Sequence, residues 1–185
     1  MKPHRFEHSN KDDLVSEDRK RSQPPEDIID RSMIDGGIVA DLGCGNGFLT
    51  IPLSHVVEKV IALDAQKEML ENLLKRSADR AFNIRPVLAE LPAIPLRDES
   101  ADHIFIVNML HEIDEKVSMV KEVHRVLRNG GGATVVDFQK KFTKKGPPLN
   151  ERIEESDVPS IFMGFQLVRH YSFDEFYQYV FRKGP

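Results

Sequence analysis

The sequence has a single cysteine, Cys44, among its 185 residues. One cysteine excludes an internal disulfide framework and any metal site built from several cysteines. The chain also lacks an apolar run long enough to cross a bilayer, and its charged beginning has no apolar core of the kind that a signal peptide carries. From these absences we expect a cytoplasmic protein without a membrane span.

An excess of positive charge is missing as well. The chain carries 26 Lys and Arg against 30 Asp and Glu, for a formal net charge of -4. No chain-wide field therefore attracts nucleic acid or an anionic membrane, although a local basic patch could. The length and the 40% hydrophobic content suit one domain with a sizeable core. We expect a single domain over residues 1–185.

Residues 1–23 are strongly charged and can bury little apolar surface. We interpret them as a solvated arm. The alternative is a lid that closes over a cleft, held there by Phe6, Leu14 and Val15.

The most informative stretch is residues 38–47, IVADLGCGNG. A short apolar strand runs directly into a turn with glycine at alternating positions, and residues 48–57 are expected to continue as a helix. Glycine lets the backbone turn tightly and lets a ligand approach main-chain atoms. The beginning of the helix directs unpaired N–H groups at the same place. The stretch therefore predicts a site for a nucleotide-like ligand.

Two details of this turn limit which ligands it can bind. Phe48 stands where the dinucleotide fingerprint has its last glycine. Asp41 lies at the end of the strand, just before the first glycine. A carboxylate there would repel a pyrophosphate, but it could pair with a cationic group or an amine.

Apolar strands and amphipathic helices alternate along the chain. We predict further strands at residues 59–63, 84–88, 102–108 and 133–138, and helices at residues 66–77 and 115–127. Nearly continuous apolar strands separated by helices are typical of a parallel sheet that is covered on both faces. Two last strands, at residues 165–171 and 176–182, have a connection too short for a crossover helix, so they should be antiparallel.

Polar side chains follow several of these strands. Asp64 comes about twenty residues after the first glycine, where Rossmann-like folds place the acid that binds ribose hydroxyls; the alternative is a cap for the next helix. His111 is a candidate general base because imidazole titrates near neutral pH, or else a histidine that only packs nearby. Asp137 could line the substrate side. Glu115 replaces the second histidine of H-E-x-x-H, so we expect no metal site.

In their order and spacing these features resemble class I S-adenosylmethionine-dependent methyltransferases, especially the small enzymes of the ubiquinone/menaquinone-biosynthesis type. The resemblance rests on motif I at residues 38–47, on Asp64, on IPLRDESAD at residues 94–102 and on LRNGG at residues 127–131. The chain departs from the family pattern at three positions, with Glu90 for Asp, Ala101 for Phe and Asn129 for Pro. The resemblance implies a Rossmann-like α/β fold: a seven-stranded, mostly parallel sheet with a C-terminal antiparallel hairpin and helices on both faces.

The resemblance also implies a cofactor, S-adenosyl-L-methionine, which becomes S-adenosyl-L-homocysteine when an O, N or C nucleophile of a small molecule attacks its methyl group. The turn would hold the methionine part, Asp64 the ribose, and Glu90 and Leu91 the adenine. Asn108 would face the sulfonium, and His111 would deprotonate an O or N nucleophile. The residues expected to contact the cofactor are Asp41, Gly43, Cys44, Gly45, Gly47, Asp64, Ala65, Met69, Glu90, Leu91 and Asn108.

Other interpretations stay open. A helix N-terminus can activate a thiol, but in this family a cysteine at the place of Cys44 is a small spacer. A non-catalytic binding protein could keep the same fold, and an NAD(P)-dependent oxidoreductase is disfavoured by Phe48 and Asp41. Residues 108–111 lack the D/N-P-P-Y/F of adenine-modifying methyltransferases, and an arsenic methyltransferase would need several cysteines. The basic loop at residues 140–145 could contact RNA, although such a charge run is more typical of a solvated loop; its lysines are Lys140, Lys141, Lys144 and Lys145.

Overall fold

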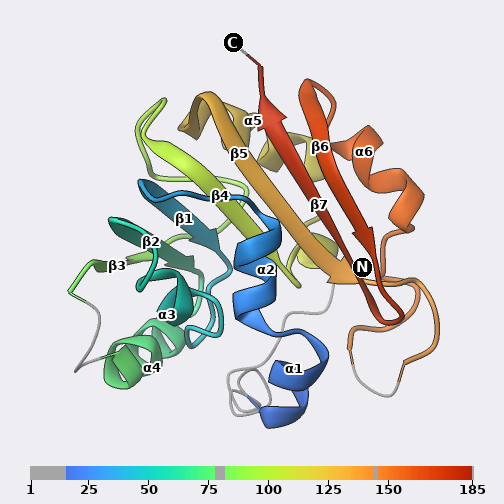
Figure 1. Ribbon diagram of the computed structural model, residues 1–185, viewed down its shortest axis with the longest axis horizontal. Coiled ribbons are helices and arrows are strands. Elements are labelled where there is room, and N and C mark those ends of the chain that lie inside the picture. Colours follow the sequence, from blue (N-terminus) through green and yellow to red (C-terminus); the bar gives the residue numbers. More distant parts are fainter. Residues whose placement is uncertain (1–15, 78–81, 144–145, 185) are drawn as a thin grey trace.

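The computed structural model describes residues 16–77, 82–143 and 146–184. Seven strands form one sheet in the order β3-β2-β1-β4-β5-β7-β6 (Figure 1). The strands are β1 Ile38–Leu42, β2 Lys59–Asp64, β3 Ile84–Leu88, β4 Ala101–Val107, β5 Leu127–Phe138, β6 Phe165–Ser172 and β7 Phe176–Lys183. The helices are α1 Glu17–Ser22, α2 Pro25–Arg31, α3 Thr50–Leu53, α4 Lys67–Ser77, α5 Lys116–Val126 and α6 Val158–Ile161, with 3-10 turns η3 Leu110–Glu112 and η4 Glu155–Asp157.

Strand directions match the sequence prediction. β1 pairs in parallel with β2 and β4, and β2–β3 and β4–β5 are also parallel. β7 is antiparallel to both β5 and β6. Among the described strands, β7 alone therefore runs against the others. The mostly parallel, seven-stranded sheet with a C-terminal hairpin is confirmed.

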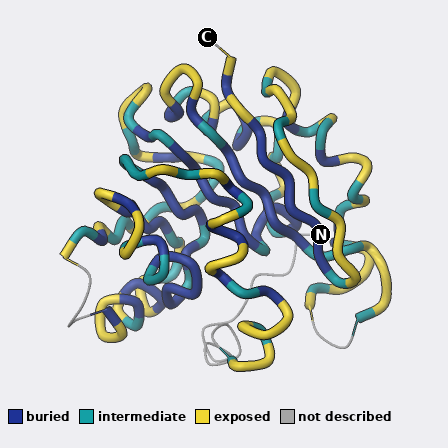
Figure 2. Tube along the Cα trace, viewed as in Figure 1, coloured by how far each residue is buried: buried dark blue, intermediate teal, exposed yellow. Residues whose placement is uncertain are grey.

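Helices cover both faces of the sheet, with α2, α3 and α4 on one face and α5 and α6 on the other (Figure 1). Side chains alternate between the two faces along a strand, so Val39 packs with the first group of helices and Ala40 with the second. Both faces are buried, which is why the central strands read as unbroken apolar runs. Figure 2 shows these central strands as the buried centre of the molecule.

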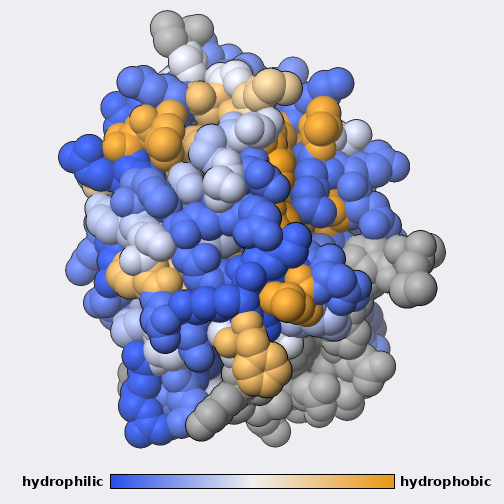
Figure 3. All heavy atoms as spheres, turned by 90° about the vertical axis from the view of Figure 1, so that its right-hand side faces the viewer, coloured by the Kyte–Doolittle hydropathy of each residue, from blue (hydrophilic) through white to orange (hydrophobic). Residues whose placement is uncertain are grey.

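The β6 edge of the sheet is mostly hydrophilic. Figure 3 looks at this side of the molecule and shows apolar groups scattered among hydrophilic ones. β6 exposes Gln166, Arg169 and His170, with Leu167 45% exposed between them. Charged side chains on an edge strand disfavour pairing with a strand of another chain.

Two predicted elements differ from the structure by more than one residue. The helix expected over residues 48–57 spans only Thr50–Leu53. It begins late because Gly45 and Gly47 have φ of 53° and 92° and residues 45–49 form turns. β5 begins at Leu127, six residues before the predicted position, where Leu127 pairs with Ala101. The glycines of this segment belong to the strand and do not stop a helix. Across the described ranges no helix is long and apolar enough to cross a membrane.

Candidate functional site

The carboxyl ends of β1, β2, β4 and β5 meet at one edge of the sheet, since these strands are parallel. The chain passes from β1 to β2 on one side and later returns to β4 on the other side of β1. Ligands of open α/β sheets bind at such a reversal of strand order, outside the carboxyl ends. In Figure 1 the arrowheads of β1, β4 and β5 point toward the side where α1 lies. This edge holds the glycine turn, Asp64, Asn108, His111 and Asp137.

The glycine turn is tied to the end of β2. The N–H groups of Gly43 and Cys44 both donate to the carbonyl oxygen of Leu63, at 2.9 Å each. Gly43 has φ of 72°, and a Cβ on it would lie 2.6 Å from the Cγ of Met109. Gly43 is therefore required by its backbone conformation and by the neighbouring side chain. Sequence reasoning did not include Met109.

Asp41 is a buried carboxyl group with one side-chain partner in α3. Only 2% of Asp41 is exposed, and the hydroxyl of Thr50 donates to its Oδ2 at 2.6 Å. Burial raises the pKa of Asp41 to about 6, although the Thr50 hydrogen bond acts in the opposite direction. A positively charged group at the turn would stabilise the ionised form of this carboxyl.

Asp64 joins the end of β2 to the glycine turn. Its Oδ2 accepts the N–H of Gly45 and its Oδ1 accepts the N–H of Gln66, both at 2.8 Å. Burial raises the pKa of Asp64, and the backbone N–H groups around it oppose that rise. The side chain thus caps the approach to α4, as the simpler interpretation held, and also lies beside the turn. A carboxylate offers about four acceptor positions, so Asp64 keeps the capacity to accept ligand hydroxyls.

His111 and Asp137 form a buried pair. The His111 Nδ1 lies 2.7 Å from Asp137 Oδ1, and the His111 main-chain N–H donates to Asp137 Oδ2 at 3.1 Å. Both residues are at most 6% exposed. Burial lowers the pKa of His111, but the charge and hydrogen bond of Asp137 outweigh it, and the pKa is raised. Glu112 and Glu151 add to this effect.

The pairing of Nδ1 with Asp137 fixes the orientation of the imidazole ring and leaves Nε2 as the second titrating atom. Nε2 lies 3.9 Å from Glu112 Oε1. A histidine held by a carboxylate in this way has the geometry of an oriented general base. Sequence reasoning named both residues but did not pair them.

Asn108 connects the end of β4 to the arm. Its side-chain amide donates to Gln23 Oε1 at 2.8 Å and its Oδ1 accepts from Gln23 Nε2 at 3.2 Å. The main chain of Asn108 has φ of 54°, unusual for a residue other than glycine. The arm residues proposed as lid anchors, Phe6, Leu14 and Val15, lie outside the described residues.

The loop that carries Glu90 and Leu91 is anchored at both ends. At its start the N–H of Ala89 donates to the carbonyl oxygen of Asp64 at 3.0 Å. Farther along, Arg125 of α5 donates to the carbonyl oxygens of Ile94 and Leu96, at 2.8 Å each. Glu90 itself is exposed, whereas Leu91 is half-buried against the core.

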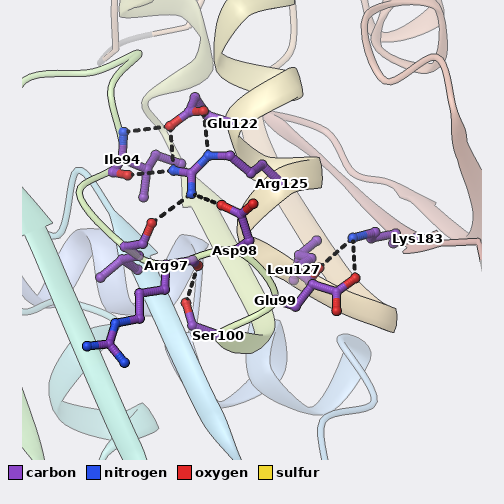
Figure 4. Close-up of polar contacts among 10 residues, drawn as sticks. Ile94, Arg97, Asp98, Glu99, Ser100, Glu122, Arg125, Leu127 and Lys183 are labelled. Atoms are coloured by element: carbon purple, nitrogen blue, oxygen red, sulfur yellow. Dashed lines mark hydrogen bonds and ion pairs between the residues drawn. The ribbon is translucent and has the colours of Figure 1, made fainter.

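Acidic side chains hold Arg125 in the position from which it donates to the loop after β3. Arg125 also pairs with Asp98 at 2.6 Å and with Glu122 at 2.7 Å. Figure 4 shows Arg125 at the centre of this network, with both carboxylates turned toward it. The network therefore links α5 to the loop that follows β3.

The other predicted residues differ in exposure. Cys44 is buried, and burial raises the pKa of its thiol well above the ordinary value, which fits a spacer and opposes a nucleophile. Met69 is 2% exposed within α4, and Ala65 is exposed.

Two lysines of the basic loop form ion pairs with acidic side chains. Lys140 pairs with Glu154 at 3.5 Å and Lys141 with Asp174 at 2.5 Å. These acids offset the positive charge that would attract RNA, and Lys144 and Lys145 lie outside the described residues.

In the part of the chain that the structure covers, no group of three or more His, Cys, Asp or Glu side chains could hold a metal ion.

Comparisons with known proteins agree on one family. The model of the methyltransferase domain family matches residues 39–131. The chain is 26% identical over 131 residues to malonyl-[acyl-carrier protein] O-methyltransferase of Hamiltonella defensa, covering 71% of this chain and 49% of that protein. It is 34% identical over 118 residues to the ubiquinone/menaquinone biosynthesis C-methyltransferase UbiE of Hahella chejuensis, covering 60% and 47%. The chain thus spans about half the length of the curated relatives it matches.

A solved structure is similar over nearly its whole length. A SAM-dependent methyltransferase from Aquifex aeolicus superposes with a TM-score of 0.89 at 26% identity. The match covers 96% of this chain and 99% of that one. The seven-stranded architecture is therefore shared along the chain and not only within residues 39–131.

Proposed function

We propose, since the chain belongs to the methyltransferase domain family, that it transfers a methyl group from S-adenosylmethionine to a small-molecule nucleophile. The observation that carries this proposal is the hydrogen bond from Gly45 to Asp64. It joins the glycine turn, suited to the amino-acid end of the cofactor, to an acid suited to the ribose. Both recognition elements thus lie side by side at the carboxyl edge of the sheet.

The groups at this edge fit S-adenosylmethionine better than a dinucleotide. Asp41 would repel a pyrophosphate, whereas the cofactor of a methyltransferase offers an ammonium group to this carboxylate. Phe48, 7% exposed, occupies the position of the last glycine in the dinucleotide fingerprint. These features disfavour the oxidoreductase alternative.

Four of the predicted residues border the cofactor beyond the glycine turn. Asp64 accepts hydrogen bonds from the ribose hydroxyls, while Glu90 and Leu91 border the adenine. When bound, S-adenosylmethionine supplies an electrophilic methyl group on its sulfonium. The chain contributes by aligning that group with the acceptor. Asn108, whose side chain pairs with Gln23, borders the sulfonium side through its position at the end of β4.

His111 acts as the general base. Its Nε2 takes the proton from the acceptor as the new bond to carbon forms, and Asp137 stabilises the imidazolium that results. A base is needed for a hydroxyl or amine acceptor, or for a ring carbon activated by ionisation of a neighbouring hydroxyl. A carboxylate acceptor is already ionised at neutral pH and needs none. The pair therefore favours an acceptor that loses a proton.

Isothermal titration tests the cofactor assignment. We expect S-adenosylhomocysteine to bind and NADH not to bind. Asp64→Asn should weaken S-adenosylhomocysteine binding by about tenfold or more, because an amide replaces a charged acceptor. Glu58→Gln is the matched control, since Glu58 is exposed and directly precedes the opposite end of the same strand. Tight NADH binding without S-adenosylhomocysteine binding would contradict the proposal.

A further inference from the structure

The arm is fixed to the carboxyl edge of the sheet just after α1. Gln23 follows α1 and is only 4% exposed, although it lies between two short surface helices. Its amide exchanges two hydrogen bonds with the amide of Asn108. Because Asn108 directly follows β4, this exchange holds the end of α1 against the site, although most residues of α1 are exposed.

Arg19 of α1 turns inward at the same place. Its guanidinium carbon lies 3.9 Å from the centre of the Phe48 ring, and Phe48 directly follows Gly47. The Nε atom of Arg19 is buried. Lys20 and Arg21, its neighbours in α1, instead pair with Glu17 and Asp18 and have side chains 45% and 76% exposed.

Arg19 and Asp41 place opposite charges beside the glycine turn. Burial lowers the pKa of Arg19 to about 10, and the charge of Asp41 opposes that fall, so Arg19 stays protonated at neutral pH. Arg19 in turn acts to lower the pKa of Asp41. The two groups are therefore close enough to influence each other; Asp41 is buried and Arg19 is half-buried.

A free amino acid group carries one carboxylate and one ammonium. A guanidinium can bind a carboxylate through two parallel N–H donors, and a carboxylate can pair with an ammonium. We propose that Arg19 binds the α-carboxylate of the cofactor's amino-acid end, so that the arm supplies part of the cofactor site. This inference rests on the proposed function, which supplies the ligand. It also gives the charged arm a task that its composition did not indicate.

Binding measurements with two ligands test this role. The probes are S-adenosylhomocysteine and its decarboxylated analogue, S-adenosyl-3-thiopropylamine, measured by isothermal titration. Arg19→Met should weaken S-adenosylhomocysteine binding by about tenfold or more, because a charge-assisted contact is lost. Binding of the analogue should change by less than about twofold, since it lacks the carboxylate. Arg21→Met, on the exposed side of α1, should leave both affinities unchanged.

The other possible results of these titrations reject the proposed role of Arg19 or the proposed function. An equal loss for the two ligands would show that Arg19 only supports the arm by stacking on Phe48, and the inference would be overturned. No loss for either ligand would overturn it as well. If Arg19→Met fails to fold, Arg19→Lys serves in its place, and a loss that is not selective for S-adenosylhomocysteine again rejects the role. If the unaltered protein binds neither ligand, the proposed function fails instead.

Discussion

At the scale of single residues, Asp137 holds the titratable imidazole ring of His111 in a fixed orientation. Each is recognisable in the sequence because His111 comes soon after an apolar strand and Asp137 lies near the end of another. Their contact at 2.7 Å is not, because it depends on how η3 folds back over the end of β5. The same holds for Thr50 and Asp41, which meet only because the turn between them reverses the chain. The sequence therefore predicts which residues lie near the site, but not which of them contact one another.

A pH profile tests the role of His111. His111→Gln should lower kcat by about a hundredfold or more, the range typical of a lost general base. His55→Gln, at an exposed histidine after α3, is the matched control. In the unaltered protein, activity should rise with pH through a pKa above the ordinary histidine value, because Asp137 stabilises the protonated ring.

Asp137→Asn should move this rise to lower pH. The substitution removes the negative charge that favours imidazolium, so the ring loses its proton at lower pH. An unchanged profile in Asp137→Asn, or full activity in His111→Gln, would remove His111 from the mechanism. Full activity would also fit a carboxylate acceptor, which needs no base.

At the scale of elements, buried parallel strands were the most predictable part of the chain. The predicted limits of β3 match the structure, those of β2 differ by one residue at one end, and those of β4 differ by one residue at each end. Turn glycines were less predictable. Gly132 lies just before the predicted strand at residues 133–138, yet it belongs to β5, where a Cβ on it would lie 2.3 Å from the Nδ1 of His103. Because Gly132 has no side chain, His103 of β4 can pack against β5 at this position. The sequence around Gly132 does not indicate that His103 lies next to it.

The contact between α5 and the loop after β3 leads to a prediction about Arg125. Arg125→Met should weaken binding of S-adenosylhomocysteine by several-fold, because the loop that presents Glu90 and Leu91 loses an anchor. Loss of charge-assisted hydrogen bonds at a site 31% exposed should lower stability by about 1–2 kcal/mol. In a domain of this size that corresponds to a melting temperature about 4 °C lower.

Arg97→Met is the matched control for Arg125→Met. Arg97 is an exposed arginine of the same loop, and Figure 4 shows its side chain directed away from Arg125. Equal effects of the two substitutions on ligand affinity would mean that Arg125 does not position the loop.

At the scale of the whole molecule, the site depends on segments that are distant in sequence. Asn108 and Gln23 are 85 positions apart, and their contact brings α1 to the edge formed by β1, β2 and β4. The sequence predicted the sheet and the position of its ligand edge, because both follow from strand order. It did not predict that α1 would lie over this edge, since the charged composition of the arm favours solvent.

A crystal structure with S-adenosylhomocysteine bound would test the central claim most directly. The account predicts ribose hydroxyls within hydrogen-bond distance of Asp64, the adenine beside Glu90 and Leu91, and the amino-acid end at the glycine turn. An adenosine group bound away from the carboxyl ends of β1 and β2, or one whose hydroxyls do not reach Asp64, would contradict it.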